Sequence, residues 1–444
     1  MKSYWKLHKV PMVMMLLSCI LYYIFAFHFE RTEFTKLVVL FIGLLVLCFK
    51  IVQFEKLNLK FILATGIIFR IIFLVTIPNL SQDFYRFIWD GELVSNFINP
   101  YLNIPNDLIL DPNLVIDNAK KLFTGMGELS PKFHSNYPPL NQLIFGIAAL
   151  LGGKSILGAV IVMRIFIILA DIGIVYFGRK LLRKLNKSPH LIFWYFLNPL
   201  VIMELTGNLH FEGVMLFFFV WSLYLLSQNN WKLAAVIYAC SISIKLVPLL
   251  FLPLFLTHFK FKKSVAFYGI VGVSILALLL PFYASEFIAN YSKTVGLWFS
   301  NFEFNSSIYN VVKTIGVSYF DAKPWELIKT YGKLTPIITI LTVLAFTFIR
   351  KNDTLNTLIT SMLWVLTIYY FISPTVHPWY IIFLVVLTCF TNYRYALVWS
   401  ASVILSYWAY SDPNYVEHLG ILTIEYLLVF SFMIYELSKQ RNKL

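Results

Sequence analysis

Residues 37–49 read LVVLFIGLLVLCF, an uncharged apolar run inside a longer apolar block at 35–51. A helix needs about 20 mainly apolar residues to cross the hydrocarbon core of a bilayer. Similar blocks recur along the chain, separated by short polar turns and two long polar segments. The sequence therefore predicts an all-α membrane protein that crosses the bilayer many times.

The composition agrees with a membrane protein and excludes a soluble one. Of the 444 residues, 59% are hydrophobic and only 13% are charged, and the mean hydropathy is +0.74, whereas soluble domains average about 25% charged residues. The net charge of +14 is explained by Lys and Arg in cytoplasmic turns, and no motif indicates nucleic-acid binding. Four cysteines lie inside apolar blocks without the spacing of a metal or redox site: Cys19, Cys48, Cys240 and Cys389.

The apolar blocks predict about 12 spanning helices in one membrane-embedded domain, residues 1–444. The positive-inside rule places the basic turns and both termini in the cytoplasm. It leaves two long extracytoplasmic loops, 79–138 and 284–333, and the first holds seven Asp or Glu against four Arg or Lys. The predicted spans are 10–27, 35–51, 60–78, 156–178, 190–206, 213–227, 264–283, 334–350, 354–373, 378–391, 396–410 and 419–437.

Two further apolar segments do not fit as single crossings. Residues 139–152 are too short, and a crossing there would place the basic cluster at 179–184 outside, so we expect a re-entrant or in-plane helix. Residues 232–257 have lysines at both ends. They predict a helical hairpin with Lys245 at its tip, where Pro248 breaks the helix.

This topology brings chemically active side chains to the outer face. Carboxylates, imidazoles, amides and aromatic rings come there from several separate segments, and such a mixture suits sugars: flat apolar faces stack on the rings while acids accept hydroxyl protons. Secondary transporters instead keep their polar groups at the bilayer midplane. The residues singled out are Asp83, Tyr85, Arg86, Asp90, His210, Glu212, Lys245, Asn305, His377 and Trp379.

A series of short motifs resembles the GT-C glycosyltransferases, with the bacterial polyprenyl-phosphate-mannose-dependent mannosyltransferases as the most similar group. The first-loop signature is Gln82-Asp83-Phe84-Tyr85-Arg86-Phe87-Ile88-Trp89-Asp90-Gly91 followed by Ile98-Asn99-Pro100-Tyr101. Further blocks follow in the expected order over residues 80–382: Tyr137-Pro138-Pro139-Leu140, Leu197-Asn198-Pro199-Leu200, Lys245-Leu246-Val247-Pro248, Phe304-Asn305-Ser306-Ser307 and His377-Pro378-Trp379-Tyr380.

The resemblance implies a GT-C-like fold in a bacterial inner membrane and transfer of a hexose, expected to be mannose, from a polyprenyl-phosphate carrier. The acceptor would be a lipid or a glycan, and the anomeric carbon would be inverted. Such a reaction needs a base for the acceptor hydroxyl and cations for the departing phosphate. Asp83 is the candidate base, and Arg86 and Lys245 are the candidate phosphate ligands. The remaining candidates would contact the substrate: Tyr85, Asp90, His210, Glu212, Asn305, His377 and Trp379.

Two departures from the family pattern leave questions open. Many relatives carry paired acids where this chain has Gln82-Asp83, which weakens a two-carboxylate metal site. The segment 207–212 reads Gly-Asn-Leu-His-Phe-Glu instead of the more usual Gly-His-Asn-Asp, so either His210 or Glu212 could take the family role. We predict no metal ligands, although a divalent ion held by Asp90, Glu212 and Glu303 stays open as an alternative.

Two other functions compete with the glycosyltransferase. A flippase or transporter of lipid-linked sugars would show internal symmetry and midplane polar sites, and the sequence shows neither. An O-antigen-type polymerase or ligase would rely on paired arginines in the large external loop, where Arg86 is the single arginine of residues 79–138.

Overall fold

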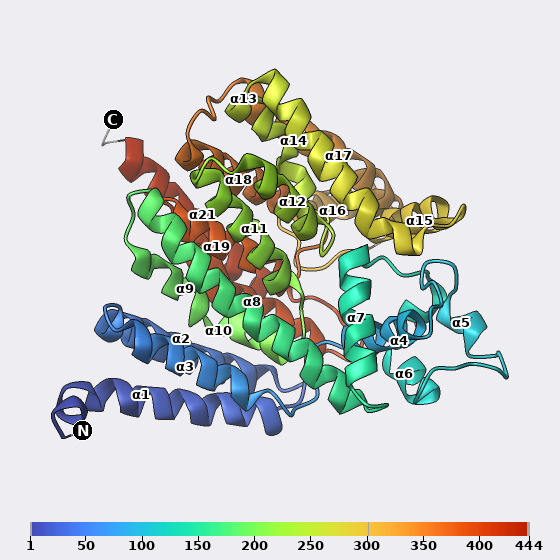
Figure 1. Ribbon diagram of the computed structural model, residues 1–444, viewed down its shortest axis with the longest axis horizontal. Helices are drawn as coiled ribbons and strands as arrows, with labels where there is room; N and C mark the ends of the chain where they lie inside the picture. The colour runs from blue at the N-terminus through green and yellow to red at the C-terminus, as the bar shows by residue number, and fades with distance from the viewer. Residues whose placement is uncertain (1, 301, 442–444) are drawn as a thin grey trace. The chain divides into compact units, whose positions relative to one another are not determined.

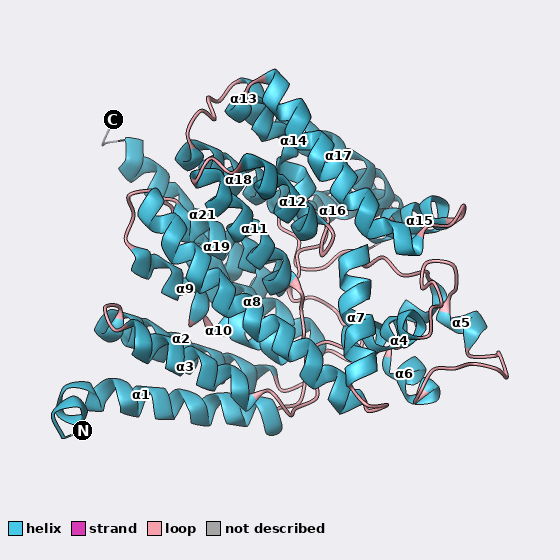
Figure 2. Cartoon of the chain, in the orientation of Figure 1, coloured by secondary structure: helices cyan, strands magenta, loops and turns pink. Residues whose placement is uncertain are grey.

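The computed structural model describes residues 2–300 and 302–441. Helices joined by loops make up this part of the chain, and Figure 2 shows no strand in it. The predicted all-α fold is therefore confirmed. The chain forms two compact units: residues 1–80, 164–213 and 378–444 make up the first, and residues 81–163 and 214–377 make up the second.

Seven helices of the described residues are long and apolar enough to cross a membrane. The sequence therefore folds as a polytopic helical membrane protein. The spans lie in α1 (Lys2–Phe27), α2 (Phe34–Glu55), α8 (Ile156–Lys184), α14 (Phe261–Leu279, continuing to Phe282), α17 (Pro324–Phe348), α18 (Leu355–Ile372) and α21 (Leu419–Arg441).

Seven is fewer than the 12 spans predicted, because several apolar blocks fold into short or broken helices. The block at 60–78 gives α3 (Leu59–Ile72), which is 14 residues long. The others become chains of short helices: η2 (Pro189–Ile192), α9 (Phe193–Phe196), α10 (Pro199–Val201) and the π-helix η3 (Ile202–Gly207); η6 (Pro378–Tyr380) and α19 (Ile381–Phe390); α20 (Tyr395–Ser402) and η7 (Val403–Ser411).

One of these breaks divides an otherwise apolar run. The segment Pro199–Gly207 and the helix α11 (Glu212–Ser227) together meet the criteria for a span, but they bend by 115° across the four residues between them. Counted as one broken span, the pair raises the number of crossings to eight among the described residues. Irregular backbone at membrane depth is tolerated where it is buried in protein or lines a polar cavity.

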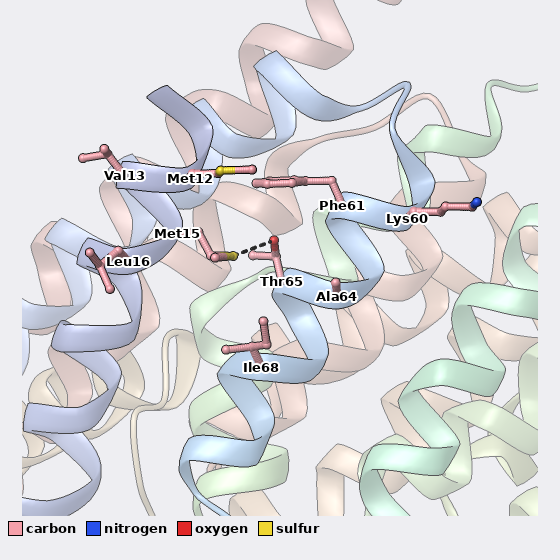
Figure 3. A pocket seen from close by; sticks show the side chains of 9 residues that line it. All are labelled: Met12, Val13, Met15, Leu16, Lys60, Phe61, Ala64, Thr65 and Ile68. Atoms are coloured by element: carbon pink, nitrogen blue, oxygen red, sulfur yellow. Dashed lines mark hydrogen bonds between the residues drawn. The ribbon is translucent and has the colours of Figure 1, made fainter. Parts of the chain in front are cut away.

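In the first unit, α1, α2 and α3 lie side by side (Figure 1). An open apolar groove of about 510 Å³ runs between α1 and α3, and Figure 3 shows the side chains that line it. Apart from the ammonium group of Lys60 and the hydroxyl of Thr65, which donates to the sulfur of Met15 at 3.4 Å, the lining is hydrocarbon and thioether. It suits a lipid chain rather than a sugar ring.

The second unit holds the two irregular segments predicted from sequence. The short apolar segment forms α7 (Pro139–Leu151), whose 13 residues agree with the expected re-entrant or in-plane helix. The predicted hairpin forms α12 (Trp231–Ile242), a turn at 243–246, then the 3-10 helix η4 (Val247–Leu254) and α13 (Phe255–Phe259). The helix breaks just before Pro248, as the sequence predicts.

The remaining elements of this unit come from the two long loops. The first loop contains α4 (Asp83–Ser95), α5 (Pro105–Leu108), α6 (Ala119–Gly125) and the 3-10 turn η1 (Ser130–Lys132). The second contains α15 (Phe287–Ser300) and α16 (Ile308–Phe320), and the short 3-10 helix η5 (Leu280–Phe282) precedes it at the end of the α14 span. Helices α4 and α7 pack closely at Gly91, because a Cβ there would stand 2.3 Å from the carbonyl oxygen of Phe145.

Candidate active site

Asp83 is the first residue of α4 and is half-buried. Its backbone N–H donates to the hydroxyl of Ser81 at 3.2 Å, and the side-chain amide of Gln82 donates to the carbonyl of Met126 at 3.2 Å. A carboxylate in the first turn of a helix is stabilised by the helix dipole. Asp83 is therefore held at a helix start, with part of its surface accessible.

Arg86, one turn further along α4, is buried and bonded inside the loop. Its Nε donates to Oδ1 of Asp90 at 2.7 Å, and its Nη1 donates to the carbonyls of Ser130 and Phe133 at 2.9 and 3.0 Å. These bonds join α4 to η1 and the residues after it. Arg86 therefore makes these bonds within the first loop, through two of its three guanidinium nitrogens.

Asp90 is the centre of a buried polar network. Its Oδ2 accepts from the hydroxyl of Ser135 at 2.5 Å and from the amide of Gln142 at 3.1 Å, in addition to the bond from Arg86. Gln142 also donates to Ser135 at 2.6 Å. The carboxylate thus links α4, the end of the first loop and α7, and buried charges need such complete pairing.

The Ser135→Ala variant tests whether this network is structural. Loss of one donor to the buried Asp90 carboxylate should lower the free energy of unfolding by about 1–3 kcal/mol. The folded protein should keep its transfer rate. Thermal unfolding in detergent and the rate per folded molecule measure the two effects. Ser95→Ala is the control, because Ser95 donates to the carbonyl of Glu92 within α4. A loss of rate without loss of stability would contradict a structural network.

Glu92 belongs to the same helix, and its pKa is raised, whereas an ion pair would lower the pKa of an acid. Burial raises the pKa of Glu92 to about 6, the charge of Asp117 adds to the rise, and a bond from the Asp117 backbone and the charge of Lys154 oppose it. Because the folded state binds this proton more tightly than the unfolded chain does, its contribution to stability is present below about pH 4.5 and is lost as the pH rises towards 6.

We therefore expect Glu92→Gln to remove one pH-dependent step in stability. The unchanged protein should lose about 1 kcal/mol, after allowance for solvent screening, between pH 4.5 and 6 relative to the variant. Unfolding midpoints measured across that range give the difference. Asp107→Asn, which changes an exposed carboxylate of the same loop, should leave the step in place. Parallel pH profiles for the unchanged protein and Glu92→Gln would exclude this effect.

The aromatic residues of the first-loop motifs also hold the loop together. The hydroxyl of Tyr101 donates to the carbonyl of Tyr137 at 2.6 Å, and the amide of Asn99 donates to the carbonyl of Phe282 at 2.8 Å. Tyr85 is half-buried, with its ring against Gly125, where a Cβ would approach the ring to 2.6 Å. These motif residues thus fix how the loop folds over α14 and α15, and Tyr85 keeps an accessible edge.

Lys245 lies in the turn after α12, and the start of α7 fixes its backbone. The N–H of Leu140 donates to the carbonyl of Ser243 at 3.0 Å, and the amide of Asn141 donates to the carbonyl of Ile244 at 2.9 Å. Lys245 itself is half-buried. Hydrogen bonds from the first residues of α7 therefore hold the backbone of the turn that carries Lys245.

The charge of Lys245 affects the pKa of His377. Burial, and then the charge of Lys245, lower the pKa of His377 to about 3, so its imidazole is neutral at neutral pH. Its ring stacks on Phe304, with ring centres 5.0 Å apart, and the segment around Phe304 pairs with Thr375 through a short parallel bridge. The adjacent Asn305 is buried with a positive φ of 47°, a conformation that Asn tolerates well.

The first unit holds the other predicted residues, His210, Glu212 and Trp379, and all three are buried. The His210 ring stacks face to face on Trp379, with centres 3.7 Å apart and planes within 18°. Its Nε2 lies 3.5 Å from Oε2 of Glu204 on the π-helix η3. Glu212 begins α11.

Three residues of this cluster were missed as site residues: Glu204, Asn208 and Tyr407. The signal for Glu204 was present, because an acid inside the apolar block 190–206 needs a partner or a function. Asn208 and Tyr407 carried no signal, since only the folded chain brings them to Glu204. Among residues 2–300 and 302–441, no three His, Cys, Asp or Glu side chains lie close enough together to hold a metal ion.

These features define a class: a polytopic helical membrane protein with acids, imidazoles and a lysine held at helix ends and helix breaks. Residues 11–260 match the family described as alpha-(1->6)-mannopyranosyltransferase, N-terminal domain, and the chain belongs to that family. The predicted resemblance to GT-C mannosyltransferases is thereby confirmed. The matched residues include α4, His210, Glu212 and Lys245.

Two relatives carry matching names. Alpha-(1->6)-mannopyranosyltransferase A of Mycobacterium tuberculosis is 21% identical over 337 residues, which cover 71% of this chain and 62% of the relative. Alpha-(1->6)-mannopyranosyltransferase B of Corynebacterium glutamicum is 26% identical over 146 residues, which cover 33% of this chain and 23% of the relative. The chain thus spans less than two thirds of the length of either relative.

Proposed function

We propose that this protein is a membrane mannosyltransferase that moves mannose from a polyprenyl-phosphate carrier to a lipid or glycan acceptor on the extracytoplasmic face. The observation that carries the proposal is the family match over residues 11–260, which contain Asp83 at the half-buried start of α4. Asp83 is half-buried at the start of that helix, so part of its surface is accessible to an acceptor hydroxyl.

In the proposed reaction, Asp83 takes the proton of the acceptor hydroxyl as the hydroxyl oxygen attacks the anomeric carbon of the sugar. The bond from that carbon to the phosphate oxygen breaks, and the bonding electrons leave with the polyprenyl phosphate. Attack opposite the leaving group inverts the anomeric configuration. A base of this kind contributes roughly 10²- to 10⁴-fold to the rate.

The departing phosphate needs a cation, and Lys245 is the side chain best suited for it. It is half-buried in a turn that α7 holds in place, and a cation in a partly dry site stabilises developing negative charge. The neutral His377 would donate one N–H rather than a charge. Arg86 and Asp90 are assigned to the shape of the loop, while Tyr85, Asn305, Trp379, His210 and Glu212 would contact sugar or phosphate.

The localisation follows from the same proposal. The basic turns place both termini in the cytoplasm, and the first loop with Asp83 outside, in a bacterial cell membrane. Cysteine labelling from outside intact cells, at Ser130→Cys in the first loop and at Lys351→Cys in a basic turn, tests this orientation. The first position should react and the second should not.

Product formation by the purified protein tests the proposed function. The protein in detergent is given polyprenyl-phosphate mannose with a radioactive sugar, and separately GDP-mannose, with a mannose oligosaccharide or a glycolipid as acceptor. Mannose should pass to an acceptor from the polyprenyl carrier only. Transport of the carrier across vesicles without any new glycosidic bond would instead identify a flippase, and joining of preassembled glycans would identify a polymerase or ligase.

A further inference from the structure

The turn that carries Lys245 is bonded to a helix about 100 positions earlier in the sequence. The turn follows the end of α12, and backbone carbonyls at a helix end need partners from outside the helix. The first turn of α7 supplies two donors. The N–H of Leu140 donates to the carbonyl of Ser243 at 3.0 Å. Nδ2 of Asn141 donates to the carbonyl of Ile244 at 2.9 Å, and Ile244 directly precedes the lysine.

The same helix also holds α4, the helix that begins with Asp83. Gln142, the next residue of α7, donates to Oδ2 of Asp90 on α4 at 3.1 Å. Two adjacent side chains of α7 thus bond to two parts of the second unit. One part is the helix with the proposed base, and the other is the turn with the proposed phosphate ligand.

Asn141 contributes little to stability beyond this one bond. Its side chain is 1% exposed, and its Oδ1 has no hydrogen-bond partner within residues 2–300 and 302–441. An unpaired buried polar atom costs free energy comparable to a lost hydrogen bond. Asn141→Leu would exchange one unpaired oxygen, Oδ1, for another, the carbonyl of Ile244, at similar side-chain volume. The main effect of the amide is therefore on the place of the turn.

The place of this turn matters because a second proposed substrate contact of the same unit, His377, is fixed as well. The N–H of Val376 donates to the carbonyl of Phe304 at 2.8 Å, and the N–H of Phe304 donates to the carbonyl of Pro374 at 3.0 Å. The charge of Lys245 reaches the imidazole of His377. Movement of the turn would change the spacing between these two groups.

We propose that Asn141 is a positioning residue, whose bond to Ile244 holds Lys245 where its ammonium group binds the phosphate of the polyprenyl carrier. The proposal rests on the proposed function for the identity of the ligand, but not for the hold on the turn. Asn141 does not touch the carrier itself. The lysine side chain is long and flexible, so a fixed backbone lowers the entropy that is lost when the ammonium group binds.

Hydrogen exchange tests the hold on the turn without any substrate. The purified protein in detergent is transferred to D2O, and mass spectrometry follows the peptide that spans residues 243–249. This peptide should exchange several-fold faster in Asn141→Leu than in the unchanged protein, because the turn has lost one of its two bonds to α7. Gln142→Met is the matched control. It changes the adjacent buried amide, whose bonds go to Asp90 and Ser135, and should leave exchange at 243–249 unchanged.

Binding of polyprenyl phosphate without a sugar tests the phosphate half, by titration calorimetry in detergent. Lys245→Met should weaken binding about 10- to 100-fold, because it removes a charge-assisted bond. Asn141→Leu should weaken it about 3- to 10-fold, since the ordering of the lysine cannot be worth more than the hydrogen bond that supplies it. The double variant should bind as Lys245→Met alone does, because Asn141 acts only through the lysine. A merely structural role would add its own loss.

Additive losses in the double variant, or unchanged exchange at 243–249 in Asn141→Leu, would overturn the proposal. If Asn141→Leu does not fold, Asn141→Ala, which removes the amide without a branched side chain, replaces it in both measurements. Polyprenyl phosphate that does not bind to the unchanged protein would also overturn the proposal. If it binds as expected but no mannose is transferred from any carrier, the proposed function fails and the positioning role of Asn141 stands.

Discussion

The Asp83→Asn variant is expected to transfer mannose about 10²- to 10⁴-fold more slowly than the unchanged protein. An amide has the shape of the carboxyl group but cannot take the proton of the acceptor hydroxyl. Initial rates with radioactive polyprenyl-phosphate mannose and a saturating acceptor measure the loss. The KM for the carrier should change little, because Lys245 is the proposed ligand of its phosphate.

The variant should remain folded, which makes the rate informative. Asp83 begins α4, where its negative charge gains about 0.3–1 kcal/mol from the helix dipole. The loss of that contribution is too small to unfold the protein or to account for the loss of rate. Asp107→Asn provides the control, since Asp107 is an exposed acid in the first turn of α5 in the same loop. Equal rates in Asp83→Asn and the unchanged protein would place the base elsewhere in the chain.

The membrane fold could be predicted because the bilayer leaves the chain few choices. Backbone groups without water must be paired inside a helix, so each long apolar block has to be helical. The blocks at 10–27 and 35–51 accordingly lie inside α1 and α2. The broken segments were harder, because hydropathy does not distinguish a helix of 20 residues from several short ones. No local pattern around Gly207 indicates Arg164, whose guanidinium donates to the carbonyl of Gly207 at 3.0 Å.

The sequence points to candidate site residues, but it does not predict the contacts that they make in the fold. Arg86 was assigned to phosphate because it follows Asp83 by one turn, although Asp90 lies four residues further on the same face, a spacing typical of a helix ion pair. The structure shows that pair, buried and joined to Ser135. Glu204 could not be placed from sequence for another reason. Its hydroxyl donor, Tyr407, lies about 200 positions away in the sequence, and no local pattern connects the two.

The largest loss of stability is expected from breaking the buried ion pair between Arg70 on α3 and Asp171 on α8. Nε of Arg70 donates to Oδ2 of Asp171 at 2.8 Å, and both side chains are fully buried. The hydroxyl of Tyr195 donates to the other carboxylate oxygen at 2.5 Å. The guanidinium also donates to the carbonyls of Gly66 and Phe196 at 3.0 Å each. The pair therefore joins two helices with the segment that carries α9.

Asp171→Leu should lower the free energy of unfolding by about 3–5 kcal/mol, because it leaves the guanidinium of Arg70 buried without a counter-charge. Thermal or denaturant unfolding in detergent measures the loss. Arg70→Leu should cost a similar amount for the same reason, with the carboxylate as the uncompensated charge.

The double variant Arg70→Leu with Asp171→Leu separates the ion pair from its packing. Apolar side chains of similar volume can replace a buried pair at little cost, since no desolvated charge is left behind. The double variant should thus be more stable than either single variant, although the bonds to Tyr195, Gly66 and Phe196 are lost with it. Additive losses from the two single variants would show that the charges do not depend on each other, and that α3 and α8 are held together by their apolar contacts instead.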